Sequence, residues 1–452
     1  MADEVDVVVI GMGPGGEDVA ARLAKAGLSV VGVESRLVGG ECPYFACIPT
    51  KIMLRAAEAL AEARRVPELA GSATVRPDWS PVAARIRDEA TTGWNDEAAV
   101  RRFEGAGGRL VRGVGRITAP GEVTVGEQVL RAQRAIVLNP GTEPAIPPIE
   151  GLAHAPFWTN RDAVAVEQVP ESLVVLGGGP VGLEFAQVFA RFGSAVTVVE
   201  AQSRLLPLAE PEASELITER LRAEGVRVLA GSAVRQVWHS GRFQVSTDDE
   251  QIEAERLLVA TGRRTDLRAL GVAAVGLDDQ ARSIPVDERM RAASGVWAIG
   301  DVTGRGAFTH TSVYQSRIAA ADILGEPGAP ADYRAMPSVT FTDPEVAAVG
   351  LTEAQAASEH DRIRTALARL PETPRGFIHK VGNEGLVKLV ADTERGVLVG
   401  ATAVGPSGGE MIGALAVAVH AEVPIARLSE MIFAYPTFHR AIQPALDELS
   451  AA

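Results

Sequence analysis

One pattern occurs twice in the sequence and restricts the fold more than any other feature. Each copy contains a short apolar run, glycines in the spacing G-x-G-x-x-G, a helical stretch and a second apolar run that ends in a glutamate. The copies cover residues 5–34 and 173–200. Uninterrupted apolar runs are typical of strands that are buried on both faces of a parallel sheet. The pattern therefore predicts two domains of the same sheet-and-helix design.

The residue types of the first copy suit a dinucleotide phosphate. Gly11 allows the tight turn, Gly13 allows the backbone to approach a pyrophosphate, and Gly16 allows the helix to pack closely on the strand. Glu34 can accept a hydrogen bond from a ribose hydroxyl. A glycine turn without a nucleotide is the alternative, but the strand, the helix and the acid at the expected offset favour a dinucleotide site.

The second copy implies a second dinucleotide, and its terminal acid bears on which one. Glu200 can bind the ribose diol of NADH, whereas its charge would repel the 2'-phosphate of NADPH. Arg204, four residues later, could offset that repulsion. The sequence therefore favours NADH and leaves NADPH open.

Both cysteines of the chain, Cys42 and Cys47, lie within residues 39–51. Two cysteines do not scaffold a chain of 452 residues, and two thiols cannot complete a tetrahedral metal site without other ligands. A redox dithiol is favoured over a structural pair or half of a metal site. Cys47 precedes a helical run that starts near Pro49, where the helix dipole favours a thiolate, and Lys51 adds a cation one turn later.

Length and charge limit the function classes. A chain of 452 residues with 46% hydrophobic residues can form about three domains. No run approaches the roughly 20 apolar residues that span a bilayer, and the acidic N-terminus lacks the pattern of a secretory signal, so we expect a cytoplasmic location. The net charge of -14 argues against binding to nucleic acid or to an anionic membrane.

Periodicity also predicts the remaining elements. We expect two helical stretches, over residues 50–65 and 80–103, followed by short strands and hairpins between residues 109 and 137. Further strands are expected at residues 339–345 and 384–390, before an apolar helix at residues 408–420.

These features together resemble the class I pyridine nucleotide-disulfide oxidoreductases, the group that contains dihydrolipoamide dehydrogenase, glutathione reductase and mercuric reductase. The resemblance rests on the C-x4-C loop, both glycine motifs and the Gly-Asp at residues 300–301, and it covers nearly the whole chain. It implies an α/β fold with two Rossmann-like dinucleotide-binding domains and an α+β C-terminal domain that pairs two subunits into a homodimer. The expected segments are 1–150 for FAD, 151–272 for NAD(P), 273–335 for FAD again and 336–452 for the interface.

The resemblance assigns roles to the residues of the dithiol region. Cys47 would be the thiol next to the flavin and Cys42 the thiol that meets the substrate. Lys51 and Glu184 match an ion pair beside the flavin's reactive nitrogen; a solvated helix residue is the less favoured alternative for each. Asp301 would bind the ribityl or phosphate portion of FAD.

Further positions are implied for the two cofactors, FAD and NADH or NADPH. The helix that starts near Thr309 and His310 would direct its amides at the isoalloxazine, although His310 could also be a capping or packing residue. Residues 139–141, Asn-Pro-Gly, stand where the family usually has Ala-Thr-Gly. The positions implied for FAD are Gly11, Gly13, Pro14, Gly15, Gly16, Glu34, Ser35, Gly40, Lys51, Gly115, Gly141, Asp301, Thr309 and His310. Those implied for NAD are Gly177, Gly179, Pro180, Val181, Gly182, Glu200, Ala233 and Gly262.

The C-terminal segment departs from the family. Disulfide-reducing members have His-Pro-Thr followed by a glutamate, and that histidine carries a proton to the leaving thiol. Here Tyr435 stands at the histidine position and Arg440 at the glutamate position. Tyrosine carries protons poorly near neutral pH, so His439 could act instead if both residues lay on one helical face; a surface or packing role is its alternative.

The sequence thus predicts an enzyme that oxidises NAD(P)H and passes electrons through FAD to a Cys42–Cys47 disulfide. Its small-molecule acceptor would be an unusual disulfide, a quinone or a metal ion. Mercuric reductase also has tyrosine at this position, but no C-terminal cysteine pair or N-terminal metal-binding extension is seen, so a dedicated mercury role is not expected. The alternatives are a flavin diaphorase or NADH oxidase that does not use the dithiol, and a non-catalytic redox sensor.

Overall fold

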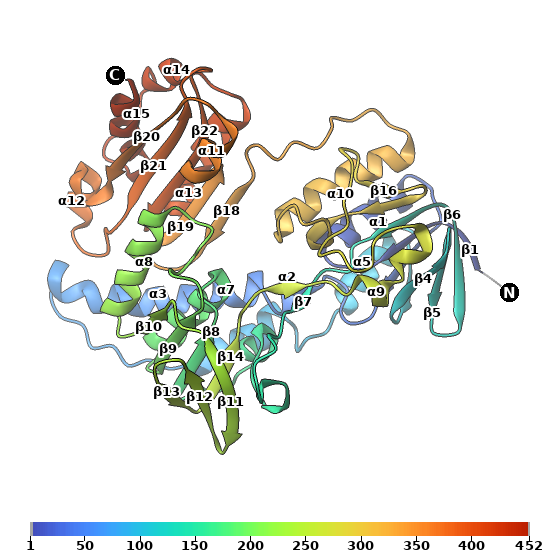
Figure 1. The fold of residues 1–452 in the computed structure, drawn as a ribbon, viewed down its shortest axis with the longest axis horizontal. Coiled ribbons are helices and arrows are strands. Elements are labelled where there is room, and N and C mark those ends of the chain that lie inside the picture. The colour runs from blue at the N-terminus through green and yellow to red at the C-terminus, as the bar shows by residue number, and fades with distance from the viewer. Residues whose placement is uncertain (1–2, 451–452) are drawn as a thin grey trace. The chain divides into compact units, whose positions relative to one another are not determined.

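A computed structural model describes residues 3–450, and its elements are shown in Figure 1. The chain folds into two compact units, each built from segments that are distant in sequence. The first unit comprises Met1–Pro49, Ala84–Ala145 and Arg263–Asp332. The second comprises Thr50–Ala83, Ile146–Gly262 and Tyr333–Ala452.

The sheet of the first unit has the order β16-β17-β6-β1-β2-β3, and β4 and β5 continue from β6. β1 pairs in parallel with β2 on one side and with β6 on the other, so its run of valines is buried on both faces, as the apolar pattern predicts. The strands are β1 (Asp3–Ile10), β2 (Val30–Glu34), β3 (Arg109–Arg112), β4 (Gly115–Ala119), β5 (Glu122–Val125), β6 (Gln128–Leu138), β16 (Arg291–Ala293) and β17 (Val296–Ala298).

Two helices of the first unit pack against each other, α1 (Pro14–Lys25) and α10 (Thr309–Leu324). α1 buries Val19, Ala20 and Leu23 on its inner face. α10 begins with Thr309, close after the turn that follows β17. Both helices therefore begin near the carboxyl ends of parallel strands, where nucleotides bind in open α/β sheets. The shorter elements of this unit are α2 (Glu41–Tyr44), α5 (Glu97–Gly105), β7 (Glu143–Pro144), β15 (Arg263–Arg264), α9 (Leu267–Leu270), η3 (Val272–Val275) and η4 (Gly300–Thr303).

The expected single helix over residues 80–103 is wrong. The structure has α4 (Ser80–Ala84), a π-helical turn η1 (Arg85–Ala90) and then a break before α5. Thr92, Gly93 and Trp94 all have positive φ values, which a right-handed helix cannot accommodate. The other expected helices are present as α3 (Cys47–Leu69) and α13 (Gly408–His420).

The second unit contains a four-stranded parallel sheet in the order β10-β9-β8-β14 and a three-stranded antiparallel sheet. Its helix α7 (Pro180–Arg191) follows the second glycine motif and buries almost its whole length. The elements of this part are η2 (Leu152–His154), α6 (Asn160–Val164), β8 (Ser172–Leu176), β9 (Ala195–Glu200), α8 (Pro211–Ala223), β10 (Arg227–Ala230), β11 (Val234–Ser240), β12 (Arg242–Thr247), β13 (Gln251–Ala254) and β14 (Arg256–Val259).

The C-terminal part of the second unit is an antiparallel sheet in the order β18-β19-β22-β21-β20, with α13 and α15 packed on it. The expected strand at residues 339–345 is divided, because residues 341–344 form a turn between β18 and β19. The elements are β18 (Pro337–Thr340), β19 (Glu345–Gly350), α11 (Glu353–Glu359), β20 (Ile363–Arg369), η5 (Leu370–Glu372), α12 (Pro374–His379), β21 (Leu386–Asp392), β22 (Val397–Gly405), α14 (Ile425–Ser429), η6 (Phe438–Ala441) and α15 (Ile442–Ser450).

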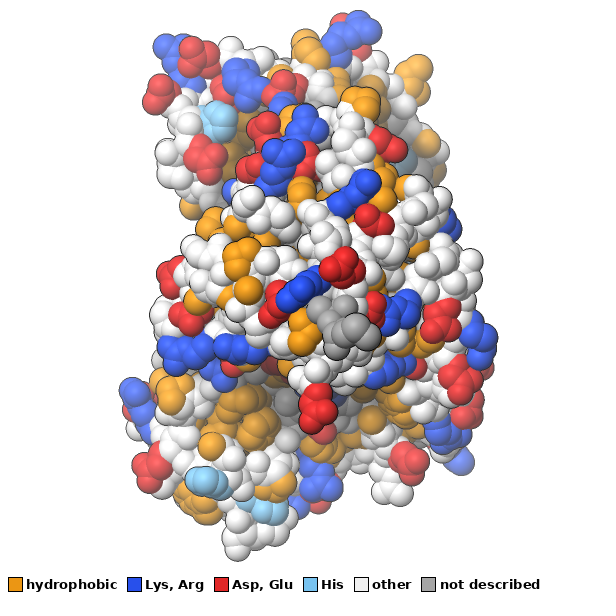
Figure 2. Space-filling model, turned by 90° about the vertical axis from the view of Figure 1, so that its right-hand side faces the viewer, with side chains coloured by type: hydrophobic (Ala, Val, Ile, Leu, Met, Phe, Trp, Pro, Cys, Tyr) orange, Lys and Arg blue, Asp and Glu red, His pale blue; other side chains and the backbone are white. Residues whose placement is uncertain are grey.

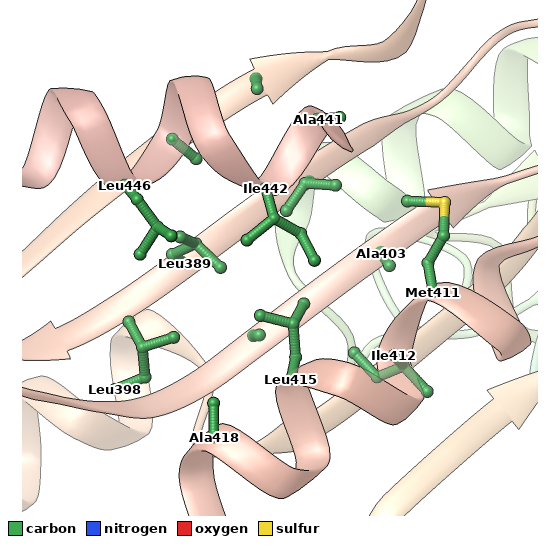
Figure 3. Close-up of a cluster of buried hydrophobic side chains, with 14 of the residues drawn as sticks. Leu389, Leu398, Ala403, Met411, Ile412, Leu415, Ala418, Ala441, Ile442 and Leu446 are labelled. Carbon is green, nitrogen blue, oxygen red and sulfur yellow. The ribbon is translucent and has the colours of Figure 1, made fainter. Parts of the chain in front are cut away.

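Figure 3 shows the core of this C-terminal sheet. Leu389 and Leu398 come from neighbouring strands, and Leu415 and Ile442 reach them from two different helices. This interdigitation joins both helices to one sheet, so the C-terminal part has a hydrophobic core of its own.

Figure 2 shows one face of the molecule, on which Lys and Arg side chains alternate with Asp and Glu side chains. Over residues 3–450, no helix is both long enough and apolar enough to span a membrane.

We expect Leu415→Ala to lower the free energy of unfolding by about 3 kcal/mol, because it leaves a cavity in a packed core. Leu415 is 2% exposed. Leu208→Ala removes the same atoms from a side chain that is 90% exposed and should change the unfolding midpoint little. Urea titration of both variants checks this, and equal midpoints would contradict the assigned core.

Candidate functional site

The first glycine turn leads from β1 into α1, and of Gly11, Gly13 and Gly16 only Gly13 has free space beside its backbone. A Cβ atom on Gly11, which has a φ of +92°, would lie 2.0 Å from the Asn139 carbonyl oxygen, and one on Gly16 would lie 2.0 Å from the Gly11 carbonyl oxygen. At Gly13 the nearest atom would be 3.4 Å away. The turn is thus packed tightly from the protein side and open at Gly13, before Pro14 starts α1. A pyrophosphate fits this arrangement.

Glu34 ends β2 and is fixed beside the glycine turn. Its Oε2 accepts a hydrogen bond of 2.8 Å from the Met12 amide, and its Oε1 accepts one of 2.8 Å from the Arg36 amide. Each carboxylate oxygen keeps acceptor capacity, which a ribose diol can use. Ser35 follows as an exposed residue, and the backbone of Gly40 passes so close to Gly13 that an added Cβ would lie 2.8 Å from its Cα.

Asp301 lies in η4, directly after β17. Thr142 Oγ1 donates a hydrogen bond of 2.8 Å to Asp301 Oδ2. Burial raises the pKa of Asp301, and this hydrogen bond opposes the rise. Gly141, with a φ of +67°, precedes Thr142, and Gly115 at the start of β4 packs against Ile10. These residues lie in the same unit as the first glycine turn.

Both cysteines belong to the first unit. Cys42 is in α2, Cys47 is the first residue of α3, and both are partly buried. The Sγ atom of Cys47 lies 3.5 Å from Oγ1 of Thr309, which is the first residue of α10. The sulfur therefore lies at the N-terminal ends of two helices, where partial positive charge favours a thiolate. His310 stacks on Phe308 with ring centroids 5.0 Å apart, which is the packing contact that the sequence left open.

Two residues to which the sequence assigned no role hold these parts together. Arg263 Nε donates to Thr142 Oγ1 at 2.7 Å, and Arg263 Nη2 lies 3.4 Å from the Glu41 carboxylate in α2. Arg263 thus links α2, the helix that carries Cys42, to Thr142, which donates a hydrogen bond to Asp301. Nothing in the sequence marks Arg263 beyond its place after Gly262.

Asn139 is the second of these residues. Its Nδ2 donates to the Gly11 carbonyl at 3.2 Å, and its Oδ1 accepts from Ser312 of α10 at 3.2 Å. The side chain, buried at 6% exposure, thus joins the glycine turn to α10. An alanine, which the family usually has here, could make neither bond.

The second glycine turn repeats the first. A Cβ on Gly177 would lie 2.4 Å from the Ala260 carbonyl oxygen and one on Gly182 would lie 2.1 Å from the Gly177 carbonyl oxygen, whereas Gly179 has no atom within 4 Å of that position. Glu200 Oε2 accepts from the Gly178 amide at 2.6 Å, as Glu34 does from Met12. All the NAD positions lie in the second unit: Pro180 begins α7, Val181 is 42% exposed, Ala233 precedes β11, and Gly262 has a φ of +115°.

Arg204 lies in the loop after Glu200 and bonds to that loop itself. Its Nη1 donates to the Ala209 carbonyl at 2.9 Å and its Nη2 to the Pro207 carbonyl at 2.8 Å. The guanidinium therefore shapes the loop instead of extending toward the ribose of a dinucleotide.

Lys51 and Glu184 form an ion pair of 2.8 Å within the second unit. The Glu184 side chain is 8% exposed and that of Lys51 is 35% exposed. Lys51 Nζ also lies 4.4 Å from the centroid of the Phe341 ring, and Glu184 Oε1 accepts from the Phe341 amide at 3.0 Å. The ammonium group is thus held between a carboxylate and an aromatic face.

Further residues on the same face of α7 hold the turn at residues 341–344. Gln187 exchanges two hydrogen bonds with the backbone of Asp343, at 2.7 and 2.8 Å. Arg191 and Arg65 both bind the Asp343 carboxylate, at 2.7 and 2.8 Å. Burial alone would raise the pKa of Asp343, but the charges of Arg191 and Arg65 outweigh it and hold that pKa below its usual value.

Tyr435 and His439 do not share a helical face, so the condition for His439 to act in place of the histidine is not met. Tyr435 lies in a turn and is 67% exposed, whereas His439 lies in η6 and packs near Phe433, with ring centroids 6.1 Å apart. Residues 431–437 contain no helix, so the i, i+4 spacing does not place the two side chains together.

Comparison with known proteins agrees with this arrangement. Residues 5–316 match the family described as pyridine nucleotide-disulphide oxidoreductase, and residues 336–446 match the dimerisation domain of that family. The chain is 34% identical to a mercuric reductase from Acidithiobacillus ferrooxidans, over 96% of this chain and 80% of the relative. It is 33% identical to a dihydrolipoyl dehydrogenase from Thermus scotoductus, over 98% of this chain and 97% of the relative.

Solved structures are similar over nearly the whole length. The copper(II) complex of RclA, an HOCl-induced flavoprotein disulfide reductase from Escherichia coli, has a TM-score of 0.87 at 26% identity and covers 99% of this chain and all of that chain. LpdA from Mycobacterium tuberculosis has a TM-score of 0.86 at 25% identity, covering 99% of this chain and all of that chain. The chain belongs to the pyridine nucleotide-disulfide oxidoreductase family, whose members are FAD-dependent flavoproteins.

Asp343→Asn should lower the free energy of unfolding by about 3 kcal/mol near neutral pH, because it leaves two buried guanidinium groups without their shared carboxylate. The pKa of Asp343 is lowered in the folded state, so its contribution is complete above about pH 4 and is lost as the pH falls through the folded-state pKa. Urea unfolding at about pH 7 and about pH 3 should therefore show the gap between wild type and variant closing in acid.

A gap that stays constant down to about pH 2 would contradict this linkage. Asp88→Asn is the matched control, since Asp88 pairs with Arg87 on the exposed surface and should leave the midpoint unchanged.

Proposed function

We propose that the protein is a homodimeric enzyme that oxidises NAD(P)H and delivers the electrons to a Cys42–Cys47 disulfide and on to a small-molecule acceptor. The observation that carries this proposal is the position of Cys47 Sγ, 3.5 Å from Thr309 and at the start of two helices, in the unit that also holds the first glycine turn and Asp301. FAD, when bound, supplies the group that takes electrons from the nicotinamide. The segments 1–150 and 273–335 would hold FAD, residues 151–272 would hold the nicotinamide, and residues 336–452 would form the dimer interface.

The two cysteines take different roles in this proposal. Two-electron reduction of their disulfide gives one thiolate and one thiol. The fields of α3 and α10 favour the thiolate at Cys47, which leaves Cys42 to react with the acceptor. Lys51, which lies one turn further along α3 and pairs with Glu184 at 2.8 Å, would be the cation that stabilises reduced flavin.

The acceptor is proposed to be one that does not need a histidine proton carrier. Tyr435 is exposed and lies in a turn, and Arg440 replaces the glutamate that would orient a histidine. The copper(II) complex of RclA and the mercuric reductases among the relatives make metal ions reasonable candidates beside disulfides and quinones.

Mutation of each cysteine separates the dithiol mechanism from its rivals. Under anaerobic NADH titration, wild type should develop a thiolate-to-flavin charge-transfer band near two-electron reduction. Cys42→Ser should show that band before any reductant is added, because Cys47 can no longer form the disulfide, and Cys47→Ser should never show it. Both variants should lose at least about tenfold in disulfide reductase kcat, since the thiol pair is interrupted.

Unchanged turnover in Cys42→Ser with bound FAD would instead identify a diaphorase or NADH oxidase. Negligible turnover of wild type with disulfides, quinones and metal ions alike would favour the non-catalytic sensor.

We propose NADH as the preferred nicotinamide, because Glu200 is fixed beside the second glycine turn by the Gly178 amide and Arg204 is bound to its own loop. Wild-type kcat/KM should favour NADH by about tenfold or more, which corresponds to about 1.4 kcal/mol. Glu200→Gln should lower the ratio of kcat/KM for NADH to kcat/KM for NADPH, chiefly because KM for NADPH falls. Arg204→Ala should affect both nucleotides alike, and a selective loss of NADPH activity would contradict the proposal.

A further inference from the structure

The C-terminal part contains a cavity of about 100 Å³ that the sequence does not predict. It lies between the start of α12 and the segment that runs from Pro436 into α15. Its lining residues are Glu372, Thr373, Pro374, Arg375, Pro436, Thr437, Arg440 and Pro444.

Two arginines line this cavity, and each lies over an aromatic ring. The guanidinium carbon of Arg375 is 5.2 Å from the centroid of Phe438, and that of Arg440 is 5.3 Å from the centroid of Tyr435. Within residues 3–450, neither arginine forms an ion pair with a carboxylate, although Glu372 lines the same cavity. This is notable in a chain with 58 acidic residues and 44 Lys and Arg residues, where arginines such as Arg191 are paired.

The ring contacts leave the N–H groups of Arg375 and Arg440 able to bind an anion. A guanidinium that stacks on a ring uses its face for that contact and keeps its in-plane N–H groups for acceptors. Two such groups on one small cavity suit a single anionic group with several oxygens, namely a carboxylate, phosphate or sulfonate. With Glu372 counted, the lining carries one net positive charge.

We propose that this cavity is an anion-binding subsite and that the electron acceptor carries an anionic group that binds there. The inference rests on the proposed function, because it takes residues 435–440 as the segment that meets the acceptor. At residue 440, an arginine reverses the charge of the glutamate that the family usually has. Arg440 and Arg375 thus bind the charged group of the acceptor.

Two aromatic disulfides test the inference in the FAD-loaded enzyme: dithiobis(nitrobenzoate), which carries carboxylates, and dithiodipyridine, which is neutral. Arg440→Gln and Arg375→Gln should each raise KM for the carboxylate-bearing disulfide by about tenfold and leave KM for the neutral disulfide and kcat nearly unchanged. Arg440→Lys should restore part of the loss. Arg427→Gln is the matched control, since Arg427 is exposed on α14 and pairs with Glu430.

Equal loss with both disulfides, or no loss with either, would overturn the inference. Line broadening of inorganic phosphate in phosphorus NMR measures binding and does not require turnover. The comparison is between Cys42→Ser protein with both arginines intact and Cys42→Ser protein that also carries Arg375→Gln and Arg440→Gln. Reduced broadening in the double variant supports the subsite even if the dithiol mechanism fails, and unchanged broadening overturns it. If the arginine variants reduce phosphate binding but do not raise KM for the carboxylate-bearing disulfide, the cavity binds free anions. That result would overturn the assignment of the cavity to the acceptor.

Discussion

The structure depends on the close approach between the end of a strand and the start of a helix, which occurs once in each unit. At Gly11 and Gly177 the turn leaves no room for a Cβ atom, and a glutamate at the end of the next strand accepts a hydrogen bond from the residue after that glycine. The result is a helix N-terminus fixed at the carboxyl edge of a parallel sheet, with a carboxylate beside it. Backbone N–H groups at such an edge attract phosphate, and the carboxylate addresses the ribose.

Around the first turn, buried polar contacts connect segments that are far apart in sequence. Asn139 joins the turn to α10, and Arg263 joins α2 to the partner of Asp301. In the second unit, α7 carries Glu184 toward Lys51 and also holds the turn that contains Phe341. A buried polar group that loses its partner costs more free energy than the pair contributes when it is intact. These contacts therefore fix the positions of the reactive groups more strictly than apolar packing alone would.

Much of this arrangement could be predicted from sequence because it is local or repeated. The glycine turns, the acids that follow them and the position of Cys47 at a helix start all follow from residues within about 30 positions of one another. The ion pair of Lys51 and Glu184 was expected from family resemblance and is present at 2.8 Å. The prediction of one helix over residues 80–103 was wrong, because hydrophobic periodicity does not detect three successive residues with positive φ. Tyr435 and His439 do not share a face, because a spacing of four residues brings side chains together only on a helix and residues 435–436 form a turn.

The sequence by itself determined the two nucleotide-binding designs, the dithiol and the family, since each depends on residue types at short, fixed spacing. Only the tertiary structure decided what the arginines do. Arg204 binds its own loop, Arg263 connects the dithiol helix to the region of Asp301, and Arg375 meets Arg440 at one cavity across more than 60 residues of chain. A long side chain with five donors can reach many acceptors, so its partner is set by which backbone segments the fold brings within reach and not by its neighbours in sequence.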